Sequence, residues 1–198
     1  MTPPGDRNAE RREQSIERLE RAAVELLATH SYADIRIEDI AAQAGMAKGS
    51  MYMYFKGKDD LYLQVFNRFF EGVFASEFGA AAELDDPAEA IRALVAFTVE
   101  QTSPNDEMVF LYHAVMDPAL LKLVRPEMDR YLQRYLGTFE ILFGRLGRKD
   151  VRSLSYLLAV LLDGIWFYRI MEMEPAELAG SPGKRAALKK TILKLFEL

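Results

Sequence analysis

The chain has 198 residues, half of them hydrophobic, which is enough for one large folded domain or two small ones. It contains no cysteine, so disulfides, zinc–thiolate sites and thiol nucleophiles are excluded. The net charge of −5 argues against a protein that binds nucleic acid through bulk electrostatics. Any DNA contact must therefore rely on a few specifically positioned Lys or Arg side chains.

The amino-terminal residues carry no apolar segment of the kind found in secretory signals. The longest uninterrupted apolar run, residues 156–162, is much shorter than the roughly 20 residues that a bilayer requires. We therefore expect a cytoplasmic protein without a membrane partner.

Apolar residues recur at helical spacing over residues 11–30, with Leu19, Ala23 and Leu27 on one stripe. This pattern predicts a first helix. Three arginines close to its start are candidates for a basic patch: Arg7, Arg11 and Arg12.

Residues 37–44 and 48–55 then predict two short helices joined by a tight turn at Gly45. The inner face of the second helix is apolar and points back at the first. Its outer face combines small, apolar and basic residues, which is typical of a helix that enters a DNA groove. An ordinary helical hairpin, with its aromatic side chains packed on the rest of the domain, is the alternative. The outer face consists of Gly49, Tyr52, Met53 and Lys56.

The remaining chain predicts further helices and no strand, because no segment alternates with period two. Asp86 followed by Pro87 is a helix start signal, and Pro126 is expected to divide one helical stretch into a short and a long helix. The fold class is therefore all-α, with about nine helices. Beyond residue 58 the expected helices span residues 59–78, 87–101, 103–116, 126–146, 150–173 and 182–196.

Residues 12–70 resemble the DNA-binding domain of the TetR family of bacterial transcriptional regulators. The resemblance implies a helix-turn-helix domain over residues 11–72, with its motif at about 37–56, followed by a helical-bundle ligand-binding and dimerisation domain over residues 73–198. The residues that carry it are Ala22-Ala23, Leu26-Leu27, Tyr32, Ile40-Ala41, Ala44-Gly45, Lys48-Gly49-Ser50-Met51-Tyr52, Tyr54-Phe55, Lys58 and Leu61.

Three positions depart from the family's usual pattern: Ser31, Arg36 and Ala47, which replaces the common Ser at the start of the recognition helix. Ser31 stands where glycine is common, so a left-handed turn there would carry strain. Arg36 replaces the usual Thr or Ser cap of the second helix, which removes a capping oxygen and adds a candidate phosphate contact. The DNA-binding residues implied by the resemblance are Arg36, Lys48, Gly49, Ser50, Tyr52, Met53, Tyr54 and Lys58.

By this resemblance the protein is a ligand-responsive transcriptional repressor. A homodimer would hold a palindromic double-stranded operator and release it when a small, apolar effector binds the carboxy-terminal domain. Flexible methionines and flat aromatic rings suit an adaptable apolar cavity, although each of them also suits a packed helical core. The candidate pocket residues are Phe97, Met108, Tyr112, His113, Met116, Phe139 and Trp166.

Two other functional classes compete with this interpretation. An enzyme is disfavoured because the only imidazoles, His30 and His113, lie in different segments, and no phosphate-binding loop or metal-ligand motif is present. We therefore expect no catalytic residue, cofactor or metal site. An all-helical carrier or adaptor, which binds a hydrophobic ligand or partner without DNA, is the second alternative.

Overall fold

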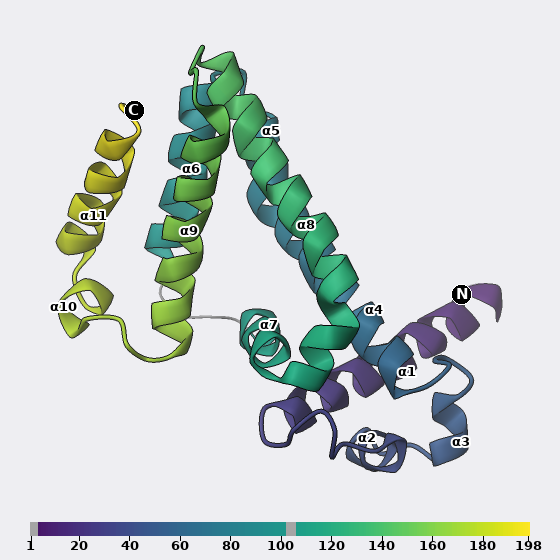
Figure 1. Cartoon of the computed structure of the whole chain (residues 1–198). Coiled ribbons are helices and arrows are strands. Elements are labelled where there is room, and N and C mark those ends of the chain that lie inside the picture. Colours follow the sequence, from purple (N-terminus) through teal and green to yellow (C-terminus); the bar gives the residue numbers. More distant parts are fainter. Residues whose placement is uncertain (1–3, 102–105) are drawn as a thin grey trace. The chain divides into compact units, whose positions relative to one another are not determined.

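The computed structural model describes residues 4–101 and 106–198, and this part of the chain is helical, without a strand. It has eleven α-helical segments in place of about nine, because four-residue segments such as α5 and α10 count separately. In chain order they are α1 (Pro4–Leu27), α2 (Ile37–Gln43), α3 (Lys48–Met51), α4 (Lys58–Val73), the π-helical turn η1 (Phe74–Phe78), α5 (Gly79–Ala82), α6 (Pro87–Glu100), α7 (Asp106–Met116), α8 (Pro118–Arg145), α9 (Val151–Ile170), α10 (Ala176–Ala179) and α11 (Pro182–Leu195) (Figure 1).

The chain divides into two compact units. Unit 1 contains the residues up to Arg68 together with Val109–Arg125, and unit 2 contains Phe69–Met108 and Pro126–Leu198. The sequence placed one boundary, near residue 72. The structure adds Val109–Arg125 to the amino-terminal unit, because this segment packs into that unit's core.

Tyr62 is at the centre of unit 1 and is fully buried. Its ring meets Tyr32 edge-on at 5.1 Å between centroids and is nearly parallel to Phe110 at 6.3 Å. Its hydroxyl donates a hydrogen bond of 2.9 Å to the carbonyl of Ala23, so its one polar atom is satisfied inside the core. Phe110 thus ties α7 to the amino-terminal helices.

Asp117 connects the same elements through hydrogen bonds. Its Oδ1 accepts from the backbone N–H groups of Ala119 and Leu120, at 2.9 and 3.0 Å, and caps the start of α8. Its Oδ2 accepts from the backbone N–H of Tyr32 at 2.8 Å and the hydroxyl of Ser31 at 3.1 Å. Burial opposes the charged form of this carboxyl, but the four hydrogen bonds outweigh it and lower the pKa of Asp117.

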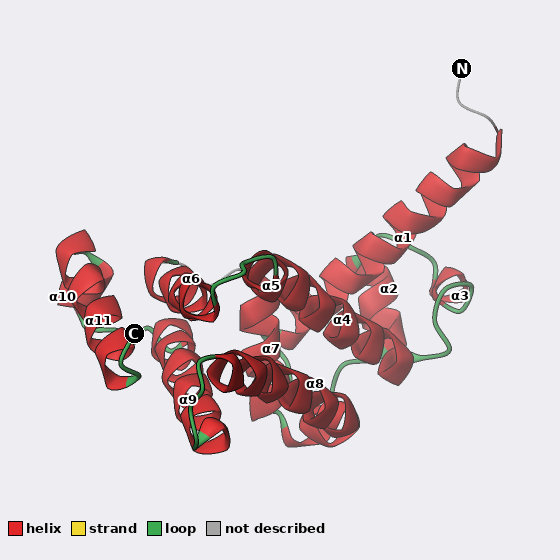
Figure 2. Ribbon diagram, turned by 90° about the horizontal axis from the view of Figure 1, so that it is seen from above, coloured by secondary structure: helices red, strands yellow, loops and turns green. Residues whose placement is uncertain are grey.

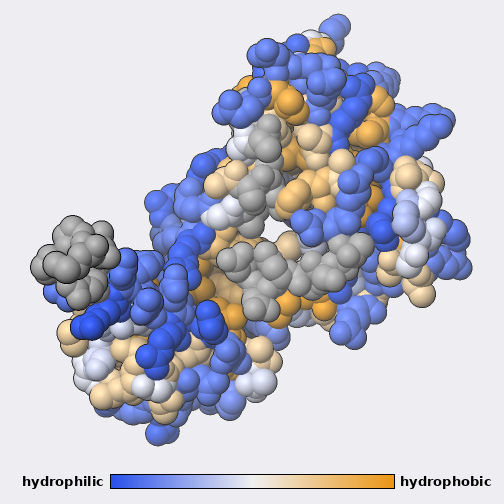
Figure 3. Space-filling view, turned by 180° about the vertical axis from the view of Figure 1, so that it is seen from behind, coloured by the Kyte–Doolittle hydropathy of each residue, from blue (hydrophilic) through white to orange (hydrophobic). Residues whose placement is uncertain are grey.

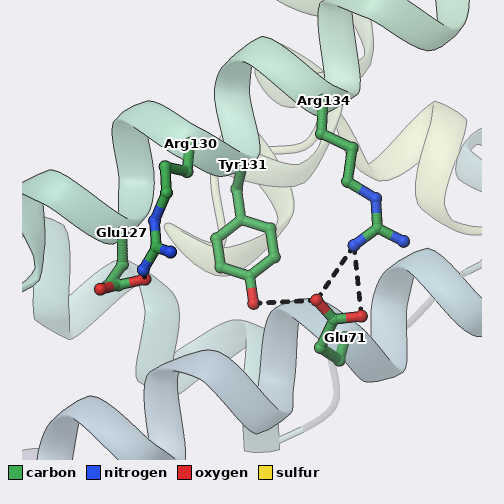
Figure 4. A network of polar contacts seen from close by, with 5 residues as sticks. All are labelled: Glu71, Glu127, Arg130, Tyr131 and Arg134. Atoms are coloured by element: carbon green, nitrogen blue, oxygen red, sulfur yellow. Dashed lines mark hydrogen bonds and ion pairs between the residues drawn. The ribbon is translucent and has the colours of Figure 1, made fainter.

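In unit 2, the helix that begins as α4 passes through η1 into α5 and stacks aromatic rings on α8. The ring of Phe70 stacks on Tyr131 at 4.3 Å, and the ring of Phe78 meets Phe139 at 5.9 Å. Tyr131 also belongs to a network of polar contacts between these helices (Figure 4). In it, Glu71 accepts from the Tyr131 hydroxyl at 3.3 Å and from Arg134 Nη1 at 3.0 Å, and Glu127 pairs with Arg130.

The prediction that Pro126 divides a helix is wrong. Pro126 lies inside the continuous helix α8. A proline in a helix removes one N–H donor, and here the 28-residue helix continues through that loss. The predicted end of this helix at Gly147 is confirmed, because Gly147 has a φ of 71° and the N–H of Arg148 bonds back to the carbonyl of Phe143 at 3.1 Å.

The start signal at Asp86 is confirmed as well, and the last helix begins at residue 182 as expected. Asp86 accepts a hydrogen bond of 2.9 Å from the N–H of Ala88 and caps α6, and Pro182 is the first residue of α11. The helix expected over residues 103–116 appears as α7, and its expected start at Ser103 lies outside the described residues.

Helix α9 has two apolar faces. One face is buried and includes Leu158, Leu162 and Trp166. The other is exposed and includes Val160 and Phe167. In the described ranges, α9 is the one helix whose length and composition would allow it to cross a membrane, with a mean hydropathy of 1.3. Core helices of soluble proteins meet the same criterion.

Candidate nucleic-acid interface

Helices α2 and α3 form the predicted helix-turn-helix in unit 1. Ile40 and Ala41 of α2 are buried, as their spacing predicted. Gly45 turns the chain with a φ of 64°, a conformation that favours glycine, and the N–H of Met46 bonds back to the carbonyl of Ala41 at 2.8 Å. Arg18 of α1 donates to the carbonyls of Ala44 and, at 3.4 Å, Gly45, so α1 holds the turn in place.

Helix α3 is shorter than the expected span of residues 48–55, since it ends at Met51. The next residues continue as a tight turn, in which the N–H groups of Tyr54 and Phe55 both bond to the carbonyl of Met51 at 3.0 Å. Met51 and Phe55 are buried and anchor this segment to the unit. The inner face is therefore as predicted, and the outer residues are presented by one helical turn plus a tight turn.

The outer face of this segment points away from the protein. The side chains of Tyr52 and Met53 are 52% and 69% exposed. A Cβ on Gly49 would meet no atom within 4 Å, so the space over this residue is open. In the space-filling view of Figure 3, the surface formed by α1 to α4 is mostly hydrophilic. Its lower edge, where α3 lies, carries less hydrophilic side chains (Figure 3). Within unit 1, this excludes the alternative in which Tyr52 and Met53 complete the core.

Tyr54 is half-buried, and the guanidinium of Arg12 lies over its ring at 5.5 Å from the centroid. The two residues are 42 positions apart in the sequence. This contact brings the amino-terminal part of α1 to the end of the α3 segment. Ser50, also half-buried, lies on α3 beside these residues.

Lys48 is exposed and forms an ion pair with the equally exposed Glu38 of α2. The hydrogen bond from Lys48 lowers the pKa of Glu38, and the same bond raises the pKa of Lys48. Exposed pairs of this kind contribute little free energy because water screens both charges, so a phosphate can replace the carboxylate at small cost. Lys56 is also exposed.

Lys58 contributes to the structure of unit 1. Its Nζ donates to the carbonyls of Tyr32 and Ile35, at 2.7 and 2.8 Å, and lies over the Tyr32 ring at 4.2 Å. The hydroxyl of Tyr32 in turn bonds to Asp59. Lys58 therefore holds the loop between α1 and α2 against the start of α4, and a phosphate would have to compete for its ammonium group.

Arg36 precedes α2 as its N-cap residue, with an exposed side chain. Its backbone N–H donates to Asp39 Oδ2 at 2.9 Å, so the start of the helix is fixed without a capping oxygen from residue 36. Ser31, which stands where the family commonly has glycine, does not adopt a left-handed turn. Among the described residues only Glu172 and Glu197 have a positive φ without being glycine.

The seven candidate pocket residues fall into both units. Tyr112, His113 and Met116 belong to unit 1, and the other four belong to unit 2. Phe139 is fully buried among aromatic rings, and Trp166 is buried with the guanidinium of Arg169 at 5.4 Å from its ring centroid. In the part of the chain that the structure describes, no group of three or more histidine, aspartate or glutamate side chains is arranged to hold a metal ion.

The family comparison matches the segment that builds this surface. Residues 20–65, from the second half of α1 into α4, match the family model described as bacterial regulatory proteins of the tetR family. Over these residues the chain is similar to the tetR family of bacterial regulatory proteins. This confirms the resemblance carried by the run from Lys48 to Phe55 and by Lys58.

Curated proteins with similar sequences are named as regulators. The fatty acid metabolism regulator protein of Bacillus subtilis is 44% identical over 45 residues, which are 23% of each chain. The transcriptional repressor NicS of Pseudomonas putida is 28% identical over 101 residues, 51% of this chain and 48% of its own. The chain therefore aligns with less than half of the length of these two relatives, and neither is named as an enzyme.

Solved structures share the fold across most of the chain. FadR from Bacillus subtilis, solved in complex with stearoyl-CoA, is 21% identical with a TM-score of 0.65, covering 90% of this chain and 96% of its own. AibR, solved with isovaleryl coenzyme A and operator DNA, is 16% identical with a TM-score of 0.64, covering 87% and 97%. At these identities the likeness establishes the all-α TetR-type fold.

Two features of the surface were not found by sequence reasoning. The contact of Arg12 with Tyr54 and the hydrogen bonds from the Ser31–Tyr32 loop to Asp117 both join residues far apart in the chain. The only sequence signal was the cluster of arginines before residue 13, which was noted as a basic patch without a location.

Proposed function

We propose that this chain is a DNA-binding transcriptional repressor that releases its operator when a small apolar effector binds. The proposal rests on one observation above all: Gly49, Tyr52 and Met53 project from the helix-turn-helix toward solvent, where apolar side chains gain nothing. A major groove gives them partners, since thymine methyl groups and base edges are accessible there.

On DNA, the residues of this surface divide into two roles. Tyr52 and Met53 contact thymine methyl groups or base edges, and Gly49 allows the backbone to approach closely. Lys48, released from Glu38, contacts phosphate, as do Ser50, Tyr54 and the exposed Arg36. Lys58 acts mainly by holding the loop before α2, with any phosphate contact secondary.

We retain residues 11–72 as the DNA-binding domain and residues 73–198 as the effector and dimerisation domain. We place the protein in the cytoplasm, with its operator.

The protein would act as a homodimer, because two recognition segments must reach two half-sites of a palindrome. The exposed apolar face of α9 supports this. Its members recur at helical spacing around Gly164, whose Cβ position is open, so a second helix can approach closely. They are Tyr156, Leu157, Val160, Phe167, Tyr168 and Met171.

The effector would be a small molecule with a large apolar part, bound in unit 2. Phe97, Met108, Phe139 and Trp166 of this unit remain the candidate lining. Two structural neighbours carry acyl-CoA ligands, stearoyl-CoA and isovaleryl-CoA, so acyl-CoA thioesters are the first class to test. The signal would reach the DNA-binding domain through α4, which begins in unit 1 and ends in unit 2. By linkage, DNA and effector would weaken each other's binding equally.

The test is a DNA mobility shift with the region upstream of the protein's own gene. The wild-type chain should shift a palindromic segment at nanomolar to micromolar concentration. The double variant Y52A/M53A should lose the shift while its helical circular dichroism and thermal midpoint stay unchanged, since both side chains are exposed. R21A, an exposed arginine of α1, is the control. A wild-type chain that shifts no upstream DNA contradicts the proposal and favours the carrier or adaptor function.

The same assay tests the effector. Addition of stearoyl-CoA or shorter acyl-CoAs should release the DNA, while free CoA should not, because the apolar chain provides most of the binding free energy. If no acyl-CoA releases the DNA, this effector class is excluded and the DNA-binding function stands.

A further inference from the structure

The amino-terminal turns of α1 extend past the helix-turn-helix. The family model begins at residue 20, whereas α1 begins at Pro4, so the first turns of this helix lie outside the matched domain. Figure 2 shows α1 reaching beyond α2 and α3 on the side of α3. Arg12 lies seven residues before the buried Leu19, about 10 Å along the helix, which equals about three base-pair steps of duplex DNA.

The face of α1 that packs into unit 1 continues along these turns as a basic face. Leu19, Ala22 and Ala23 are buried, and the i, i+4, i+7, i+11 spacing places Arg12 in line with Leu19 and Ala23. Arg11 lines up with Ala22 in the same way. The acidic residues of this part of the helix fall on another face, away from α3. They are Glu10, Glu13 and Glu17.

Arg12 links this basic face to the recognition segment. Its guanidinium lies over the ring of Tyr54, two residues after the exposed Tyr52. Arg11 is exposed, and in the described part of the chain neither arginine has an ion pair with an acidic side chain. Two guanidinium groups without a carboxylate partner, beside a surface proposed to bind DNA, match the chemistry of phosphate recognition.

We propose that the overhanging turns of α1 form a second DNA contact, in which Arg11 and Arg12 bind backbone phosphates flanking the half-site read by α3. This inference rests on the proposed DNA-binding function and adds a contact surface to it. The two arginines bind without regard to sequence, because phosphates carry no base information. They would extend the footprint by about three base pairs at each half-site.

The experiment measures operator affinity against salt for the full-length chain. The slope of log K against log salt should fall by about 1 for each lost phosphate contact, so R11A and R12A should each lower it by about 1 per subunit. The matched control is R21A, which removes an exposed arginine from the same helix outside the basic face and should leave the slope unchanged. Removing three flanking base pairs from each end of the operator should weaken the wild type and have little further effect on R11A/R12A.

R11A is the decisive variant, because Arg11 does not lie on the Tyr54 ring and its loss leaves the α3 segment unaltered. A slope in R11A equal to that of the wild type overturns the proposal, even if R12A binds more weakly, since Arg12 would then only position Tyr54. A wild type that binds no operator at all is the separate failure of the proposed function and is seen before any variant is compared.

Discussion

Gly45 and Gly49 are four residues apart and have opposite structural requirements. Gly45 holds a left-handed turn with a φ of 64°, and a Cβ there would stand 3.0 Å from Arg18 Nη2. Gly49 has ordinary helical geometry and open space above it. The first glycine is therefore required by the fold, and the second only by what approaches from outside.

Substitution by alanine should separate these two requirements. G45A should lower the free energy of unfolding by about 1–2 kcal/mol, the cost of a left-handed residue with a side chain. G49A should leave it unchanged or raise it slightly, since alanine favours helix, while operator affinity falls because the new methyl group blocks close approach. Urea unfolding and a DNA shift assay measure the two effects. Equal destabilisation by both variants would contradict this assignment.

At the level of elements, Asp117 joins the start of α8 to the loop between α1 and α2. It accepts four hydrogen bonds, two within the cap and two from the loop. Asp86 offers a comparison, because it caps α6 by a bond to Ala88 and makes no contact with that loop among those described. The two caps differ mainly in this long-range link.

D117A should lower the free energy of unfolding by about 1–2 kcal/mol at neutral pH, the usual cost of losing a helix cap. The pKa of Asp117 is lowered in the folded state, so its contribution is complete above the ordinary value of 3.8 and is lost as pH falls through the folded pKa. The difference between wild type and D117A should therefore shrink below pH 3.8, as measured by urea unfolding from pH 7 to pH 3.

D86A is the matched control for the long-range link. Both variants remove a cap, but only D117A should also weaken operator binding, because it frees the loop that Lys58 and Tyr32 hold beside α2. A loss of DNA affinity in D86A as large as that in D117A would contradict the role given to the loop.

At the level of the whole molecule, the exposed apolar face of α9 points to a contact with a second subunit. Side chains such as Val160 and Phe167, 48% and 44% exposed, lie on one stripe opposite the face that packs in unit 2. An exposed apolar stripe of this extent on one helix is typical of a subunit interface. The homodimer proposed above is the assembly that would bury it.

Placing charges on this stripe should separate the subunits. V160E/F167E should be monomeric at micromolar concentration by sedimentation velocity, with the helical content of the wild type, because both positions are already exposed. It should also bind a palindromic operator much more weakly, since one subunit reaches only one half-site. K190E, an exposed position on α11, should remain dimeric. A dimeric V160E/F167E would place the interface elsewhere.

The elements that depend on near neighbours were predictable from the sequence alone. The helix cap at Asp86, the helix start at Pro182, the turns at Gly45 and Gly147, and the inner and outer faces of α2 and α3 follow from spacings of a few residues. These patterns were predictable because capping, left-handed turns and helical periodicity are decided within one or two turns of chain. The family resemblance was likewise readable from the sequence, since it rests on motif residues between 12 and 70.

Which distant groups meet is set by the tertiary structure. It placed Asp117 on the loop at Ser31 and Tyr32, Arg12 over Tyr54, and Lys58 on two backbone carbonyls, where sequence reasoning had assigned Lys58 to phosphate. It also kept α8 continuous through Pro126, although local rules favour a break there. These outcomes depend on the packing of segments tens of residues apart, and packing free energy outweighs the local preference of any single residue.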